Sequence, residues 1–237
     1  MENREMKNSE RLIWGILLTA IVFLLSSFVS RKLQINIDFF PKSFWGLTFI
    51  LILSIALIYG LKKHVNYKIA IPKFKKTLKP MLFGFLAAVI VNALMTIIGK
   101  VFGIDAESHY AFGVMSPLQI FLFVFIYASV VEEVLFRGFL QNILNPMKNK
   151  GVKIFKRHIS LPVIIGAIAF SLAHLNLIST GAGAFFLVRT LISTFVLGLI
   201  AGYYQEKYDN NAYAILTHMA ANFMGLVAAL ILNANII

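Results

Sequence analysis

Seven long apolar runs constrain the fold of this chain more than any other feature of its sequence. Each run is close to the roughly 20 residues that an α-helix needs to cross the hydrocarbon core of a bilayer. Hydrophobic residues make up 59% of the 237 residues and charged residues 14%, whereas soluble domains carry roughly 25% charged residues. The sequence therefore predicts an all-α, polytopic membrane bundle. The predicted spans are Leu12–Ser30, Phe44–Leu61, Pro80–Val101, Pro117–Leu144, Leu161–Ile178, Ala184–Tyr204 and Ala212–Ala234.

The number of spans is expected to be seven, with eight as the alternative. The segment Val101–Ser116 is the place for an eighth span or a re-entrant piece. The first run is long for a signal peptide and lacks a clear cleavage site, so we expect it to be retained as a span. No soluble domain fits between the runs, and we expect residues 1–237 to form a single membrane domain.

The distribution of Lys and Arg predicts the orientation in the cell membrane. With the N-terminus in the cytoplasm, 16 of the 22 Lys and Arg residues fall in cytoplasmic segments and four in outside segments. Cytoplasmic loops carry such an excess in multi-pass proteins. The net charge of +12 therefore indicates topology and contact with anionic lipid. We expect no nucleic-acid partner, because no soluble segment interleaves aromatic and basic residues.

Ionisable residues inside the predicted spans are the strongest indication of function. A charged side chain at the bilayer centre costs about 2.5–3.5 kcal/mol on insertion scales and marks a functional site by default. The chain has no cysteine, which excludes thiolate ligands and a cysteine nucleophile. We therefore predict a catalytic core in residues 117–237. Its candidate site residues are Glu132, Glu133 and Arg137 in the fourth span, His174 in the fifth, and His218 and Asn222 in the seventh.

Helix geometry suggests different roles for the two glutamates. Glu133 and Arg137 are four residues apart, so they share one helical face and can pair. Glu132 points about 100° away from Glu133 around the helix axis, so it can face a different partner and act as a general base. The alternative is that both carboxylates are solvated near the cytoplasmic interface. The apolar run continues beyond them to Leu144, which argues against that alternative.

Three short motifs in this order resemble the CPBP family of CAAX prenyl proteases and bacteriocin-processing or bacteriocin-immunity membrane proteins, also called Abi proteins. The family signature is Glu-Glu-x-x-x-Arg, then Phe-x-x-x-His, then His-x-x-x-Asn or Asp, each on its own helix. The matching segments are Glu132-Glu133-Val-Leu-Phe136-Arg137, Phe170-Ser-Leu-Ala-His174 and His218-Met-Ala-Ala-Asn222.

The resemblance implies a helical membrane fold with a polar cavity that opens to the cytosol and the lipid, and peptide-bond hydrolysis within it. Carried over by position, Glu132 would activate a water molecule with the help of His174. His218 and Asn222 would stabilise the oxyanion of the tetrahedral intermediate.

By the same resemblance, Glu133 and Arg137 would order the site. The alternative is a zinc metalloprotease mechanism. A catalytic zinc site needs three protein ligands and a water. His174, His218 and Glu132 could supply those ligands. The His-Glu-x-x-His spacing of familiar zinc proteases is absent, so we favour glutamate-activated water.

The sequence thus favours an intramembrane endopeptidase that acts on a membrane-embedded, amphipathic or lipidated peptide. The alternative is a non-catalytic bacteriocin self-immunity or sensor-binding membrane protein. The intact motifs favour the enzyme, because a scaffold need not keep Glu132, His174 and His218 together. A transporter would be expected to carry an internal repeat and matching broken helices, which the sequence does not show.

Overall fold

The structure, a computed structural model, describes residues 6–33, 37–104 and 114–234. It confirms the all-α bundle, and six helical segments within these ranges are long and apolar enough to cross a membrane. The chain is therefore a multi-pass membrane protein. The six segments are α1 (Asn8–Leu33), α2 (Ser43–Gly60), α3 (Phe74–Val101), the segment Pro117–Gln141, α7 (Leu161–Ala173) with the 3₁₀ turn η4 (His174–Thr180), and α8 (Ala184–Tyr208).

The seventh predicted span is also a helix, α9 (Ala212–Ala234). The helix is apolar over Ala212–Val227, and the sequence stays apolar through Leu232. The suggested eighth element around Val101–Ser116 includes residues 105–113, which lie outside the described residues. That alternative stays a prediction.

The segment Pro117–Gln141, here called the central helix, carries the Glu-Glu-x-x-x-Arg motif. It consists of α5 (Pro117–Gln119), the π-helical η1 (Ile120–Ala128), α6 (Ser129–Glu133) and the π-helical η2 (Val134–Gln141). A capping box starts it, because the Ser116 hydroxyl accepts from the Gln119 amide and the Gln119 side chain accepts from the Ser116 amide. The wider π turns differ from the regular α-helix that the sequence predicts, and such turns are frequent at functional sites.

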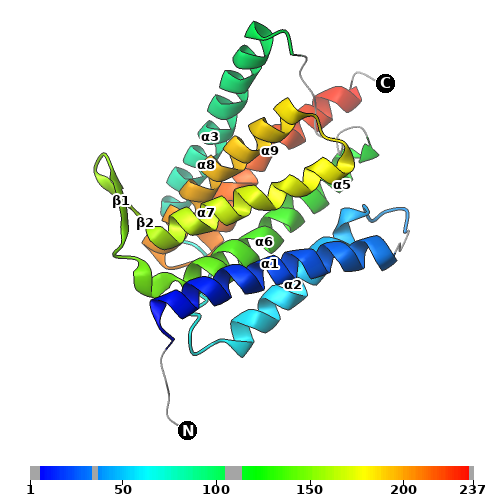
Figure 1. Ribbon diagram of the computed structural model, residues 1–237. Helices are drawn as coiled ribbons and strands as arrows, with labels where there is room; N and C mark the ends of the chain where they lie inside the picture. The colour runs from blue at the N-terminus through cyan, green and yellow to red at the C-terminus, as the bar shows by residue number, and fades with distance from the viewer. Residues whose placement is uncertain (1–5, 34–36, 105–113, 235–237) are drawn as a thin grey trace.

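Helices α1, α2, α7 and α9 lie around the central helix (Figure 1). It contacts α2, α7, α9 and α1, while α1 packs on α2 and α3 packs on α8 and α9. The buried core follows the central helix and its end, where Leu135, Phe139 and Ile143 are 0% exposed. Large apolar side chains of α1 and α3, such as Leu24 and Ile97, are exposed, as expected for surfaces that face lipid. The site motif is thus in the most protected part of the bundle.

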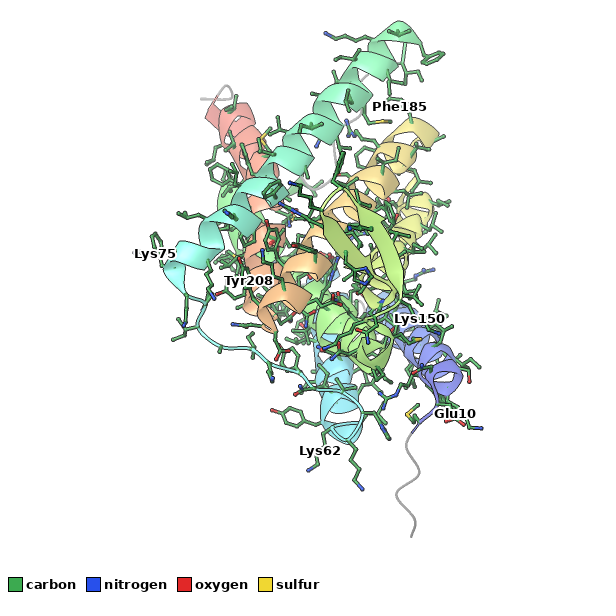
Figure 2. All side chains as sticks on the ribbon, turned by 90° about the vertical axis from the view of Figure 1, so that its left-hand side faces the viewer. Glu10, Lys62, Lys75, Lys150, Phe185 and Tyr208 are labelled. Atoms are coloured by element: carbon green, nitrogen blue, oxygen red, sulfur yellow. The ribbon has the colours of Figure 1, made fainter. Side chains whose placement is uncertain are left out.

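Several boundaries differ from the sequence-based ones. Helix α3 begins at Phe74, so Pro80 lies inside the helix. The basic loop after the central helix holds the 3₁₀ turn η3 (Asn145–Met147) and an antiparallel hairpin of β1 (Gly151–Ile154) and β2 (Arg157–Ser160). Figure 2 shows Lys62 at the end of the bundle opposite Phe185, and Lys75 and Lys150 also below Phe185 in that view. One end of the bundle is therefore basic, as the predicted topology requires.

Candidate active site

A fully buried ion pair forms the base of the candidate site. Arg137 donates from Nη1 to Glu133 Oε1 over 3.0 Å, and both side chains are 0% exposed. This is the pair that the four-residue spacing predicts. A charge is costly in such surroundings unless it is paired, so each residue requires the other.

His218 of α9 lies between the two glutamates of the central helix. Its Nδ1 is 2.9 Å from Glu133 Oε1, a hydrogen bond in which the ring nitrogen donates to the carboxylate. Its Nε2 is 3.9 Å from Glu132 Oε2, which is longer than a hydrogen bond. The Glu133 side chain is fully buried, whereas that of Glu132 is 23% exposed. The two carboxylates therefore have different surroundings but face the same imidazole.

Phe170 is the centre of the aromatic packing in this site. The rings of His174 and His218 meet it edge-on at centroid distances of 5.1 and 5.4 Å. The Arg137 guanidinium lies over the same ring, 4.6 Å from its centroid, as a cation–π contact. Phe170 thus brings the Phe-x-x-x-His helix against both other motifs.

His174 has one ring nitrogen occupied by the backbone. Helix α7 ends at Ala173, and His174 Nδ1 is 2.9 Å from the Phe170 carbonyl oxygen. A carbonyl only accepts, so Nδ1 carries the proton in the neutral ring and Nε2 keeps its lone pair. This tautomer follows from the hydrogen bond and suits a proton acceptor.

Asn222 binds the central helix one turn before the glutamates. Its Nδ2 donates to the Val124 carbonyl over 3.3 Å and to the Ser129 hydroxyl over 3.1 Å. Both amide hydrogens are engaged there, on the face of α9 that also carries His218. The role of Asn222 at an oxyanion stays a prediction.

Two residues that contact the backbone of the Glu-Glu-x-x-x-Arg motif or the glycine after it, Asn211 and Tyr67, could not be identified from the sequence. Asn211 is fully buried and donates from Nδ2 to the Glu133 backbone carbonyl over 3.2 Å. Tyr67 packs on Gly138, where an added Cβ would lie 2.8 Å from the tyrosine ring. Burial raises the pKa of Tyr67 above its ordinary value, because the phenolate would lose water there. Asn211 directly precedes α9, and no sequence motif indicates its contact with Glu133.

The zinc alternative requires three ligands around one point. Among the described residues, no group of three His, Asp or Glu side chains is placed to hold a metal ion. His218 Nδ1 faces Glu133 and His174 Nδ1 faces a carbonyl, so the Nε2 atom of each ring is the one left to bind a metal. The zinc alternative stays a prediction. The polar cavity expected around the site stays a prediction.

Comparison with known proteins agrees with the motifs. Residues 114–224 match the family model described as Type II CAAX prenyl endopeptidase Rce1-like, a range that contains all three motifs. No curated protein and no solved structure gives a significant match. Residues 114–224, slightly under half of the chain, are therefore similar to the type II CAAX prenyl endopeptidases of the Rce1-like family.

Proposed function

We propose that this protein is an intramembrane endopeptidase that hydrolyses a peptide bond with a water molecule activated by Glu132. The observation that carries the proposal is the continuous chain of contacts from Arg137 through Glu133 and His218 to Glu132 in a buried part of a membrane protein. The match to a family of CAAX endopeptidases supports it.

The site combines two carboxylates with one guanidinium and one imidazole. Glu132 and Glu133 face the same imidazole of His218, and Arg137 pairs with Glu133. The partly exposed Glu132 is the carboxylate that can take a proton from water.

The reaction follows from these positions. Glu132 takes a proton from water as the water oxygen attacks the peptide carbonyl carbon. The resulting oxyanion is stabilised electrostatically by the His218 side chain. The carbon–nitrogen bond then breaks, and the leaving amine takes the proton from Glu132. The products are one new carboxylate and one new amine.

The other motif residues have supporting roles in this proposal. His174 keeps Nε2 as an acceptor and orients the attacking water or shares its proton. Asn222 fixes the spacing between α9 and the central helix through Val124 and Ser129. Glu133 and Arg137 fix the position of His218 and therefore position the catalytic groups.

The substrate class is a membrane-embedded, amphipathic or lipidated peptide. The cluster is built on helices that cross the membrane, so the scissile bond must come to the bilayer. Glu132 is the member with a partly exposed side chain, and it is the group that water and substrate can reach.

Cleavage of a panel of membrane-anchored and lipidated peptides in nanodiscs tests the proposal. The wild type is compared with Glu132→Gln, which keeps the shape of the side chain but removes the base. General bases contribute roughly 10²–10⁴-fold, so we expect the Gln variant to lose at least about 100-fold in kcat/KM. The matched control is Glu206→Gln, a glutamate of α8 whose carboxylate accepts from Ser160 over 2.6 Å outside the cluster.

We expect Glu206→Gln to cleave at the wild-type rate. A folded wild type that cleaves none of the peptides, or a Glu132→Gln variant that cleaves equally well, would contradict the proposal. The non-catalytic immunity or sensor-binding role would then be the better account.

A further inference from the structure

A basic pocket lies at the lysine-rich end of the bundle, away from the candidate active site. It has a volume of about 310 Å³ and lies between the start of α1, the loop after α2 and the end of the central helix. This volume is at the lower end of the roughly 300–1,000 Å³ of small-molecule sites. The pocket is therefore large enough for a headgroup. Residues on its wall include Arg11, Lys62, His64, Asn66, Asn145 and Lys148.

The wall of this pocket is strongly positive. Among the lining residues that the structure describes, four are Lys or Arg and none is Asp or Glu. Lys62 and Lys148 approach from different elements. Lys62 forms no ion pair with a carboxylate among the described residues, whereas Lys148 interacts electrostatically with Glu206. Lys62 is thus available to an anion, and Lys148 adds positive charge to the same wall.

Arg11 makes the pocket a built feature of the fold. It is 8% exposed and donates from Nη1 to the His64 and Ile143 carbonyls, each over 3.1 Å, and from Nε to the Met6 carbonyl over 3.2 Å. These bonds tie α1 to the loop after α2 and to the end of the central helix. The guanidinium is held in place, so its charge contributes to the pocket while the two lysines supply donors.

The pocket lies where the polar groups of the cytoplasmic leaflet are expected. Helix α1 starts at Asn8, α2 ends at Gly60 and the central helix ends at Gln141, so three membrane helices end around it. The Lys and Arg distribution places this end in the cytoplasm. Lys62 and Glu10 both lie toward the lower end of the bundle in Figure 2, the first just after α2 and the second in α1.

We propose that this pocket binds the phosphate group of an anionic phospholipid of the cytoplasmic leaflet. Basic pockets between membrane helices on the cytoplasmic side take such headgroups, because lysines and amide donors match the phosphate oxygens. The amides of Asn66 and Asn145 complete the donor set. The proposal uses the predicted orientation and is independent of the proposed proteolysis.

An acidic neighbouring pocket restricts where an anion can lie. It has a volume of about 270 Å³, shares Asn145 and Lys148 with the basic pocket, and is also lined by Glu206 and Asp209. These acids repel a phosphate, so the headgroup is confined to the side of Arg11 and Lys62. The polarity of the two pockets therefore gives the bound lipid one position.

The position links lipid binding to the catalytic segment. Asn142 lines both pockets and donates from Nδ2 to the carbonyls of Arg137 over 2.9 Å and Gly138 over 3.1 Å. A headgroup on the wall next to Asn142 would connect α1 and the loop after α2 to the end of the helix that carries Arg137.

Native mass spectrometry of the full-length protein tests the site. The detergent-purified protein is titrated with phosphatidylglycerol and, separately, with phosphatidylcholine of the same acyl chains. We expect the wild type to bind phosphatidylglycerol first. Since each lysine near an anionic surface gives about a fivefold gain, Lys62→Ala with Lys148→Ala is expected to weaken this binding about 25-fold.

The matched control removes two other exposed lysines from the same end, Lys75→Ala with Lys153→Ala, and is expected to bind as the wild type does. Equal loss in both double variants, or equal binding of the two lipids by the wild type, would overturn the proposal. A third arm adds inorganic phosphate alone. If phosphate binds as tightly as the lipid and displaces it, the ligand is a soluble phosphate and the lipid assignment is wrong.

Discussion

Arg137 makes several of the contacts that hold the candidate site together. It is fully buried and pairs with Glu133, and its Nε and Nη2 find no hydrogen-bond partner among the described residues. The guanidinium also lies over the Phe170 ring. Buried donors of this kind are normally satisfied by ordered water, so the interior next to Arg137 is expected to hold water.

Replacement of Arg137 should destabilise the protein through the charge left behind. We expect Arg137→Met to lower the free energy of unfolding by about 3–5 kcal/mol, because the Glu133 carboxylate stays buried without the guanidinium and with only His218 beside it. Unfolding in mixed micelles measures the loss. In Glu133→Gln with Arg137→Met the stranded charge is gone, so the double variant should be more stable than the single one. A double variant that loses the sum of two single losses would contradict this account.

The sequence predicted the Glu133–Arg137 pair because the pair is local to one helix. It did not predict that His218 contacts both glutamates, because that contact joins residues 85 positions apart and depends on how α9 packs. Glu132 and Glu133 point to different sides of the helix, as their spacing predicts, and they differ in exposure. The position of one imidazole between them depends on another helix and could not be predicted.

Helix α3 packs closely on α9 next to His218, and this packing positions the His218 side chain. A Cβ added at Gly84 would lie 2.3 Å from the backbone oxygen of Thr217, the residue next to His218. Backbone atoms cannot rotate away, so any side chain at Gly84 must separate the two helices. A small residue at such a contact is typical of membrane helices that pack closely.

Gly84→Ala should therefore reduce both stability and peptide cleavage. Overpacking of this kind costs roughly 1–3 kcal/mol, and the displacement of α9 moves His218 from Glu133. The control is Gly60→Ala at the end of α2, where an added Cβ meets nothing within 4 Å. Thermal unfolding in detergent together with the cleavage assay measures both effects. Equal behaviour of the two alanine variants would show that the α3–α9 contact does not position the site.

The elements that could not be predicted from the sequence are those whose apolar residues do not repeat at a regular helical or strand spacing. The hairpin of β1 and β2 turns at Phe155, which has a φ of 52°, in the left-handed region where a glycine or asparagine is usual. No turn signal in the sequence marks it, and the segment was expected only as a basic connection. The π-helical turns of the central helix could not be predicted either, because the search for helices assumes 3.6 residues per turn.

The arrangement of the whole molecule follows from lipid as the solvent. The apolar runs predicted the membrane helices well, because length and hydropathy alone decide them. Their packing order could not be predicted, because lipid-facing and helix-facing side chains are equally apolar.

The predicted orientation can be tested with single cysteines, since the chain has none of its own. We expect Lys42→Cys, before α2, to react with a membrane-impermeant maleimide in intact cells. Lys153→Cys, in the exposed strand β1, should react only after permeabilisation. The reverse pattern would place the basic end outside and remove the basis for a cytoplasmic lipid site.

The most direct test of the central claim is hydrolysis in H₂¹⁸O, with both fragments of a cleaved membrane peptide analysed by mass spectrometry. The account predicts that the wild type places one ¹⁸O in the new carboxylate and none in the fragment with the new amine. Glu132→Gln should give no labelled fragment over the same time. A folded wild type that yields no fragments, or a Glu132→Gln variant that yields the same labelled products, would show that Glu132 does not activate water in this protein.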